Sequence, residues 1–283
     1  MNRTHGAPLW LRGSAACSAA LMSSVFGFII VCALSAAADG NFKSLAGSVW
    51  QPDSGQFGMA PMILSTLLVS LGALAHGWLL AVGCACFIHG IGPRFLGRAL
   101  LALIRFMTAI PTVVYGFASI FLLTPLIRNG LGGSGLCWLT ASLILGLQIL
   151  PSMTLTLDGA MKGVRAETEL TALALGLSPQ EHLAWVILPS CRKALVSSAV
   201  LGFGRAAGDT LIPTMLAGNA VQFASSPLDS VRTLTAHIGL VTSSDISGQA
   251  YSSMFLAGGI LLLFSTAASL TLRLLAPKKE NCS

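Results

Sequence analysis

Long runs of apolar residues, separated by short polar stretches, make up most of the chain. Six runs cover residues 15–38, 59–88, 112–127, 136–157, 194–217 and 254–275. About 20 apolar residues in a helix match the roughly 30 Å hydrocarbon core of a membrane. Backbone groups in that core must bond within their own segment, so such runs cross it as helices. The pattern predicts an all-α, polytopic membrane protein with six transmembrane helices.

The first run leaves two interpretations open. Arg3 and Arg12 precede it, and three alanines at 36–38 resemble a signal-peptidase site. A signal peptide has an apolar core of about 7–15 residues, and this run is longer, so an uncleaved first helix is favoured over a cleaved leader. The chain then divides into an N-terminal helix with a periplasmic loop, the main membrane domain and a cytoplasmic tail, at residues 1–57, 58–275 and 276–283.

A break is expected before the third span. Residues 95–108 are amphipathic, with arginines on one side, which is typical of a helix that lies at the membrane surface. Pro111 then interrupts an apolar segment that continues to residue 127. Such a break is tolerated in a membrane where protein or a cavity surrounds it. The sequence therefore predicts a broken helix at this point.

Composition and charge support the membrane assignment. The chain is 54% hydrophobic and 9% charged, whereas about 25% of residues are charged in an ordinary soluble domain. Its mean hydropathy is +0.79. The net charge of +6 would suit nucleic acid only if the basic residues formed a soluble patch, and they are spread over short loops instead. We expect membrane lipid around the chain and no nucleic-acid partner.

The basic residues also predict how the chain crosses the membrane. Loops on one side contain only Lys43, Arg128 and Arg232. The termini and the loops on the other side contain Arg3, Arg12, Arg94, Arg98, Arg105, Lys162, Arg165, Arg192, Lys193, Arg273, Lys278 and Lys279. Cytoplasmic loops carry the excess of Lys and Arg in membrane proteins. Both termini are therefore expected in the cytoplasm.

Signatures of catalysis are missing from the sequence. There is no GxxxxGK[ST] phosphate loop, no HExxH and no GxSxG, which are the usual marks of ATP hydrolysis, zinc proteolysis and a serine nucleophile. The seven cysteines form no CxxC pair and lie mostly within apolar runs, where cysteine behaves as a small hydrophobe. We expect no enzyme activity and no metal or other cofactor bound by this chain.

Two charged residues interrupt the fifth apolar run. Arg205 and Asp209 lie near its middle, and an arginine at the bilayer centre costs about 2.5–3.5 kcal/mol on insertion scales. In one continuous helix their spacing of four would place them on the same face, turned toward a watery cavity. The alternative is structural: the two side chains pair, and Gly204 and Gly208 let a neighbouring helix pack closely. Asp158, after the fourth run, is interpreted as a charge that solvates a helix end.

Segment 169–189 carries a motif. It reads ELTALALG, then nine residues, then VILP, and it resembles the EAA loop of binding-protein-dependent ABC importer permeases. The resemblance implies a helix–glycine–helix loop that docks on a separate ATPase subunit. Its coupling residues would be Glu169, Ala172, Gly176, Leu188 and Pro189. Leu170 and Thr171 depart from the family pattern, which puts a specific ion pair there in doubt. The alternative is an ordinary amphipathic cytoplasmic loop with a glycine turn.

Within that family the chain is similar to the phosphate-specific permeases, and closer to the PstC type than to the PstA type. The matching stretches are FGMAPMILSTLLVS, IPTVVYGFASIFLLTPL, ALALGLSPQEHLAWVILP, GRAAGDTLIPTMLAGN and VRTLTAHIGL. The resemblance implies a type I ABC importer permease fold in the bacterial inner membrane. It also implies three kinds of partner: a second permease subunit of PstA type, a dimer of ATPase subunits that uses ATP and Mg, and a phosphate-binding protein.

By the same resemblance, the family motif GRAxGET places Arg205 and Asp209 on the phosphate path, with Asp in place of the usual Glu. A guanidinium presents paired donors that match phosphate oxygens. The Asp209 carboxylate can accept a hydrogen bond from a P–OH group, which sulfate lacks at neutral pH, so Asp209→Asn is expected to weaken the preference for phosphate. Two other functions stay open: the same machine carrying molybdate, tungstate or sulfate, and a membrane scaffold or sensor that transports nothing.

Overall fold

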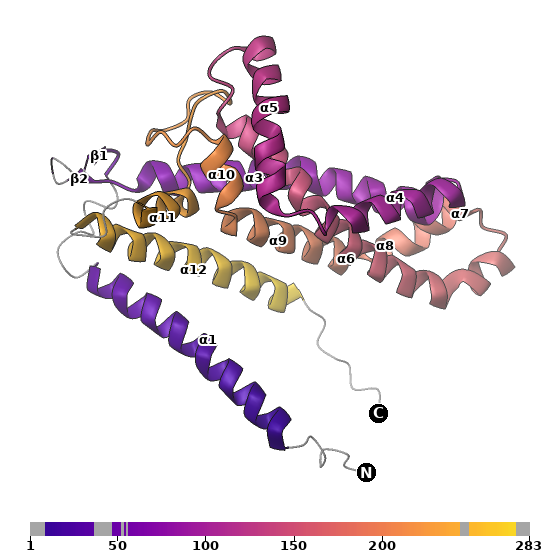
Figure 1. The fold of residues 1–283 in the computed structure, drawn as a ribbon. Coiled ribbons are helices and arrows are strands. Elements are labelled where there is room, and N and C mark those ends of the chain that lie inside the picture. The colour runs from indigo at the N-terminus through magenta and orange to yellow at the C-terminus, as the bar shows by residue number, and fades with distance from the viewer. Residues whose placement is uncertain (1–8, 37–46, 52–53, 55, 244–248, 276–283) are drawn as a thin grey trace.

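The computed structural model describes residues 9–36, 47–51, 54, 56–243 and 249–275, most of which are helical (Figure 1). The tail 276–283 and the last two alanines of the possible cleavage site lie outside these residues. Strands β1 and β2 pair in antiparallel fashion. The elements are α1 (Leu9–Ala36), β1 (Trp50–Gln51), β2 (Gln56–Phe57), α3 (Ala60–Cys86), η3 (Phe87–Ile91), α4 (Arg94–Met107), α5 (Thr112–Leu131), α6 (Trp138–Ala174), α7 (Pro179–Glu181), η4 (His182–Ile187), α8 (Leu188–Ser190), α9 (Arg192–Gly208), α10 (Leu211–Leu216), α11 (Leu234–Ser243) and α12 (Gln249–Leu275).

Among the described residues, five helices are long and apolar enough to cross a membrane. They are Trp10–Ser35, Ala60–Ile91, Thr112–Leu131, Trp138–Ala174 and Ser252–Thr271. A sixth span results if the bent pair Pro179–Ser190 and Arg192–Gly208, whose helices are bent by 68°, counts as one. The expected all-α membrane fold is confirmed, and a sixth span is reached only through this pair, of which Arg192–Gly208 is the part that packs between the spanning helices α3 and α6.

The fifth predicted span, residues 194–217, is not one helix. Helix α9 ends at Gly208, and Asp209 is extended, with φ −73° and ψ 132°. Pro213 explains the break, because in a continuous helix its ring would collide with the Asp209 carbonyl and it has no N–H to donate to it. The prediction that Arg205 and Asp209 share one helix face is therefore wrong.

Helix α6 is longer than the fourth apolar run. The sequence pattern ends this span near residue 157 and predicts a loop after it, but the helix continues to Ala174. An ion pair one turn apart supports the extension, since Lys162 Nζ lies 2.7 Å from Asp158 Oδ2. The added turns are rich in polar residues, so hydropathy gives no sign of them.

Helices α3, α6 and α9 pack together and form the centre of the bundle (Figure 1). Helices α3 and α6 approach each other closely at two glycines, where a Cβ on Gly77 would lie 2.8 Å from the carbonyl oxygen of Gly146. Next to this contact, His76 Nε2 lies 3.3 Å from the Leu143 carbonyl oxygen. Small residues at such crossings let backbones approach closely within a membrane.

Helix α4 folds back beside α3, and α5 leaves the bundle at a steep angle (Figure 1). Pro111, with φ −61° and ψ 143°, immediately precedes α5. The expected broken helix is confirmed. Along α4, Arg94 and Arg98 are exposed while Ile104 is buried, so the helix is amphipathic as predicted. The turn between α4 and α5 brings the end of one and the start of the other against α6 and α9.

The loop 218–233 closes over the first turn of α6. The backbone N–H of Trp138 donates to the Asp229 carbonyl at 3.1 Å, and its indole Nε1 donates to the Ser226 carbonyl at 2.8 Å. The first N–H groups of a helix have no partner within the helix, and the loop satisfies two of them, since the Leu139 N–H also donates to the Pro227 carbonyl at 3.1 Å. This end of α6 is thereby fixed.

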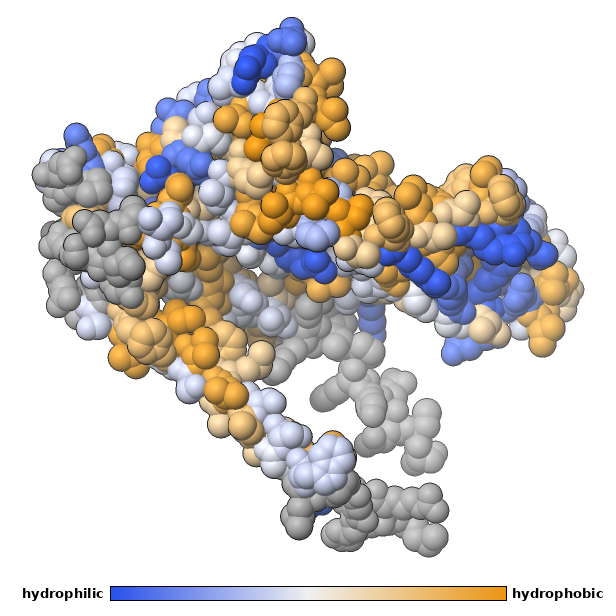
Figure 2. All heavy atoms as spheres, viewed as in Figure 1, coloured by the Kyte–Doolittle hydropathy of each residue, from blue (hydrophilic) through white to orange (hydrophobic). Residues whose placement is uncertain are grey.

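Apolar side chains cover much of the outside of the helices. Figure 2 shows hydrophobic residues over α5 and along α1, and hydrophilic residues near the end that carries α7. Helix α1 packs beside α12, with the rings of Phe28 and Phe255 centred 5.9 Å apart. An apolar surface of this extent suits helices in lipid, and the hydrophilic end suits water.

Candidate functional site

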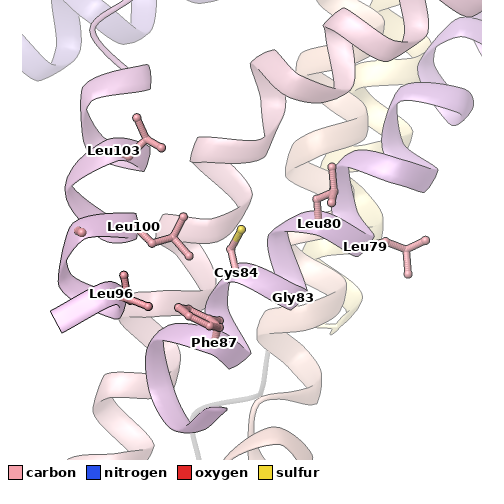
Figure 3. A pocket seen from close by; sticks show the side chains of 9 residues that line it. Leu79, Leu80, Gly83, Cys84, Phe87, Leu96, Leu100 and Leu103 are labelled. Atoms are coloured by element: carbon pink, nitrogen blue, oxygen red, sulfur yellow. The ribbon is translucent and has the colours of Figure 1, made fainter. Parts of the chain in front are cut away.

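A large hollow between α3 and α4 offers nothing to a charged solute. Its volume is about 620 Å³, and Figure 3 shows apolar side chains from both helices around it. The lining consists of Leu79, Leu80, Gly83, Cys84, Phe87, Leu96, Ala99, Leu100 and Leu103. An anion placed there would lose its water and gain no charged or strong donor, which is costly. The hollow is therefore excluded as an anion site.

A smaller cavity lies where α4 and α5 meet α6 and α9, and it is polar. Its volume is about 260 Å³. Pockets for drug-sized ligands are roughly 300–1,000 Å³, so this one suits a small ion with part of its water. Its lining consists of Met107, Thr108, Ile110, Pro111, Thr112, Tyr115, Gln148, Pro151, Ser152 and Arg205. One cation and several neutral polar groups are the features that an anion site requires.

Arg205, near the end of α9, is exposed, and it interacts with Asp209 through charge attraction alone, without a bond. Within the described part of the chain its guanidinium makes no hydrogen bond and no salt bridge shorter than 4.0 Å. A Cβ added to Gly204 or Gly208 would meet no atom within 4 Å, so no helix packs closely there. The alternative of a structural pair with Asp209 is thus not what the structure shows. The cation is available to a solute that enters the cavity.

Asp209 holds the start of α10. Its Oδ1 accepts hydrogen bonds from the backbone N–H groups of Leu211 at 2.9 Å and Ile212 at 3.2 Å, which are free donors of a first helical turn. Its carbonyl accepts a 2.7 Å hydrogen bond from the Thr235 hydroxyl. Asp209 does not line the cavity that contains Arg205. The structure gives it a capping role, and its part in selecting phosphate stays a prediction.

The cavity also contains a polar side chain that the sequence pattern did not single out, Gln148 of α6. The hydroxyls of Thr108, Tyr115 and Ser152 donate to backbone carbonyls at 2.6, 3.0 and 2.8 Å. Gln148 Oε1, by contrast, is buried and has no partner among the described residues. Because the Gln148 side chain carries no charge, it does not stand out within the fourth apolar run. Its spacing of four from Ser152, which places both on one helix face, was the available signal.

The first half of the coupling motif forms a glycine-terminated helix end. Glu169 Oε1 lies 3.4 Å from Arg165 one turn earlier, and Ala172 is buried. Gly176 follows the helix with φ +70°, and the N–H of Leu177 donates to the Ala172 carbonyl at 3.0 Å. These features define a Schellman ending, which favours glycine. The segment has the helix–glycine–helix shape that the resemblance implies, and its docking on an ATPase stays a prediction.

The second half of the motif turns back under the bundle. Leu183 and Ile187 of the π-helical segment η4 are buried against the ends of α3 and α6. Leu188 is half-buried at the start of α8, and Pro189 beside it is exposed. The motif therefore presents a rigid corner whose inner side is fixed by apolar contacts.

Large apolar side chains project from this corner into the surroundings. Trp185 is 77% exposed and Leu170 is 82% exposed. With Leu173 and Leu175 they form what we call the coupling surface: Leu170, Leu173, Leu175 and Trp185. Exposed apolar patches next to polar residues mark protein-binding surfaces.

Asp158 is buried, so its interpretation as a solvated helix-end charge is wrong. Its Oδ1 lies 3.0 Å from Nε2 of His89 in η3, which continues α3, and its Oδ2 lies 2.7 Å from Lys162 Nζ. Arg165 adds a 2.9 Å hydrogen bond to the His89 carbonyl. Because α6 continues past residue 157, Asp158 faces a neighbouring helix and ties α3 to α6 above the coupling surface.

The described part of the chain contains no metal-binding cluster and no disulfide. It holds no group of three or more His, Cys, Asp or Glu side chains that could bind a metal ion. Its cysteines are free thiols. Among these residues the polar cavity is the best placed site for a small charged solute.

The sequence of most of the chain matches a known family of transport proteins. The family described as "Binding-protein-dependent transport system inner membrane component" matches residues 87–281, which is more than half of the chain. The chain belongs to this family. It is a permease subunit of an ABC importer in the bacterial inner membrane, and it is not an enzyme.

Curated relatives align with the permease over most of both chains. A "Phosphate transport system permease protein PstC" from Mesorhizobium japonicum is 26% identical over 245 residues, covering 80% of this chain and 75% of the relative. A protein of the same name from Pasteurella multocida is 28% identical over 260 residues, covering 85% and 81%. The "Probable ABC transporter permease protein YqgH" of Bacillus subtilis is 28% identical over 238 residues, covering 82% and 76%.

Solved structures show the same fold. Two inward-facing crystal forms of the MetNI methionine ABC transporter align with the permease. One has a TM-score of 0.60 at 13% identity, covering 81% of this chain and all of the other. The second has a TM-score of 0.57 at 16% identity, covering 76% and 94%. The type I ABC importer permease fold is confirmed.

Proposed function

We propose that the permease carries inorganic phosphate into the cell as one subunit of an ATP-driven importer. The observation that supports this most is the guanidinium of Arg205, which makes no hydrogen bond or salt bridge to the described residues, in a polar cavity that suits a small ion. A guanidinium stays charged at any working pH and offers paired N–H donors in the geometry of a tetrahedral oxyanion. The relatives named PstC add support from their printed function.

A second permease subunit of the PstA type would complete the cavity. Arg205 is exposed in the single chain, and α5, which starts beside the cavity, carries large apolar side chains that the rest of the chain leaves uncovered. The most exposed are Phe117, Phe121, Leu122, Leu126 and Leu131. In lipid, helices associate through close packing of such surfaces. An assembled pair would enclose the anion between two subunits.

The coupling surface and its motif residues would bind the ATPase dimer. The chain has no phosphate loop of its own, so ATP and Mg act in that partner. The basic loops on the same side favour a cytoplasmic place for this end and for both termini. The loop 218–233 lies at the opposite end of α6, where a phosphate-binding protein would deliver its cargo.

Uptake of radioactive phosphate by vesicles that contain the complete importer tests the proposal. Arg205→Ala is expected to lower uptake at least about tenfold, which corresponds to roughly 1.4 kcal/mol. Arg205→Lys should retain part of it, because the charge remains and the paired donors are lost. The matched control is Arg98→Ala, since Arg98 is exposed and its Nε donates only to the Arg94 carbonyl of its own helix. Equal uptake by Arg205→Ala and the control would contradict the proposal.

The remaining alternatives differ in measurable ways. Molybdate, tungstate or sulfate as the natural cargo would compete with labelled phosphate at lower concentrations than phosphate itself. A scaffold or sensor would give no uptake, and no ATPase would co-purify with it. The selectivity expected of Asp209 from the sequence is tested in the same assay: a narrower preference for phosphate over sulfate in Asp209→Asn would support it, and an unchanged preference would leave Asp209 with its capping role alone.

A further inference from the structure

We propose that Gln148 is a specificity-determining residue of the permease, whose carboxamide oxygen accepts a hydrogen bond from the protonated oxygen of phosphate. This inference rests on the proposed function and adds a group to the site of Arg205. It assigns the recognition of the anion's proton to a neutral side chain on α6. Arg205, on α9, would bind the charged oxygens of the same anion.

The position of Gln148 supports this role. It lines the polar cavity together with Arg205, and Ser152 lies one turn farther along the same helix face. Pro151, on the next turn, also lines the cavity. A proline within a helix leaves a carbonyl without its N–H partner. The carbonyl freed in this way is that of Leu147, which does not line the cavity, so the acceptor on this wall is the Gln148 side chain.

The hydrogen-bond state of Gln148 supports it further. Its Oε1 is buried without a partner among the described residues, whereas the hydroxyls of Tyr115 and Ser152 already donate to carbonyls. Buried polar atoms are normally satisfied, and an exception calls for a ligand, a water or a functional reason. Gln148 and Arg205 line the same cavity, so a protonated anion bound at Arg205 would satisfy this acceptor once the carboxamide turns toward it.

A carboxamide suits the proton of phosphate better than the available carboxylate does. Asp209 does not line the cavity, and its Oδ1 already accepts two backbone N–H groups. A carboxylate would also repel the anion, whereas the amide is neutral. The amide can donate from nitrogen to one phosphate oxygen and accept at oxygen from the P–OH group. Sulfate has no proton at neutral pH, so it would leave Oε1 unsatisfied.

Exchange of Gln148 for methionine isolates this contact. Gln148→Met keeps the length and the unbranched shape of the side chain and removes both donor and acceptor. With the complete importer in vesicles, we expect the KM for labelled phosphate to rise about tenfold with little change in maximal rate. We also expect the preference for phosphate over sulfate, measured by competition, to fall by a similar factor. Arsenate, which keeps a proton at neutral pH, should lose affinity as phosphate does.

Two further variants make the result decisive. Gln148→Asn keeps the carboxamide one methylene farther back and should give a KM between those of the wild type and Gln148→Met. Ser142→Ala, on the same helix, removes a buried hydroxyl that donates to the Leu139 carbonyl outside the cavity, and should match the wild type. A structural role for Gln148 would lower the amount of importer in the membrane without changing the sulfate preference.

The outcomes separate this inference from the proposed function. Unchanged KM and unchanged sulfate preference in both Gln148 variants would overturn the inference, as would lower importer content with normal selectivity. If Arg205→Ala still lost uptake in that case, the proposed function would stand. No phosphate uptake by the wild-type importer would remove both.

Discussion

The carboxylate of Asp209 bonds to two consecutive backbone N–H groups, those of Leu211 and Ile212. Both groups would otherwise lack partners, because they open the short helix α10. The guanidinium of Arg205, four residues earlier, donates no hydrogen bond to any described residue. The two charges therefore have separate roles: the Asp209 carboxylate caps α10, and the Arg205 guanidinium remains accessible to a solute.

Substitution at Asp209 separates its cap from its charge. Asp209→Ala removes the acceptor and is expected to cost about 1 kcal/mol of stability, as other helix caps do. Asp209→Asn keeps an oxygen for the same N–H groups and should cost less. Thermal unfolding of the purified chain in detergent compares the two midpoints. An equal shift in both variants would show that the charge, and not the cap, carries the stabilisation.

Among helical elements, the short α7 owes its start to a capping box. The Ser178 hydroxyl and backbone N–H donate to Glu181 Oε2 at 2.7 and 2.8 Å, and the Glu181 N–H donates to the Ser178 hydroxyl oxygen at 3.3 Å. The hydrogen bond from the Ser178 hydroxyl, and next that from its backbone N–H, lowers the pKa of Glu181 below its ordinary value. The ionised form is therefore the one that the folded corner prefers.

This preference makes the corner sensitive to acid. A carboxyl whose pKa is lowered by folding stabilises the fold above its unfolded pKa, and the stabilisation is lost as pH falls through the folded pKa. Hydrogen exchange of the amides in 178–187, corrected for intrinsic rates, should show strong protection near neutral pH and weaker protection in acid. Ser178→Ala should lower the protection at neutral pH and remove most of its pH dependence. Equal protection of the wild type at both pH values would contradict this assignment.

Hydropathy predicts the membrane-spanning elements well, because a backbone in the hydrocarbon core must form its hydrogen bonds within its own helix. The spans α3, α5, α6 and α12 follow from it, and Arg205 stands out because a charge in such a run is costly. The extension of α6 depends on local ion pairs that hydropathy does not see. The break after Gly208 had a signal in Pro213, four residues beyond Asp209. Gln148 was missed because its importance lies in which groups surround it in space.

At the scale of the whole molecule, α5 leaves several large apolar side chains uncovered beside the polar cavity. It projects from the bundle (Figure 1), and Phe121 and Leu122 are both mostly exposed. Lipid alone would cover an apolar surface of this kind. The first turn of α5, however, forms part of the wall of the polar cavity, and the single chain leaves that cavity open beside Arg205. The whole-molecule arrangement favours a second permease at this face.

Truncation on α5 tests that arrangement. Phe121→Ala combined with Leu122→Ala should leave the chain in the membrane, since both residues remain apolar. Association with the second permease should weaken by about 1–2 kcal/mol, because buried aromatic anchors dominate interfaces. The measurement is the amount of second permease that co-purifies in detergent. Leu79→Ala combined with Leu80→Ala, on an exposed part of α3, is the matched control, and equal recovery from both double variants would refute the placement.

Helix α6 has one more consequence for how the importer must move. Its 37 residues form a rod about 55 Å long, with Gln148 on the cavity wall and Ala172 at the far tip, about 36 Å away along the axis. If the ATPase docks at this tip, as proposed, a displacement there would reach the cavity wall along one continuous helix, in which Pro151 interrupts the hydrogen-bond ladder between the two ends.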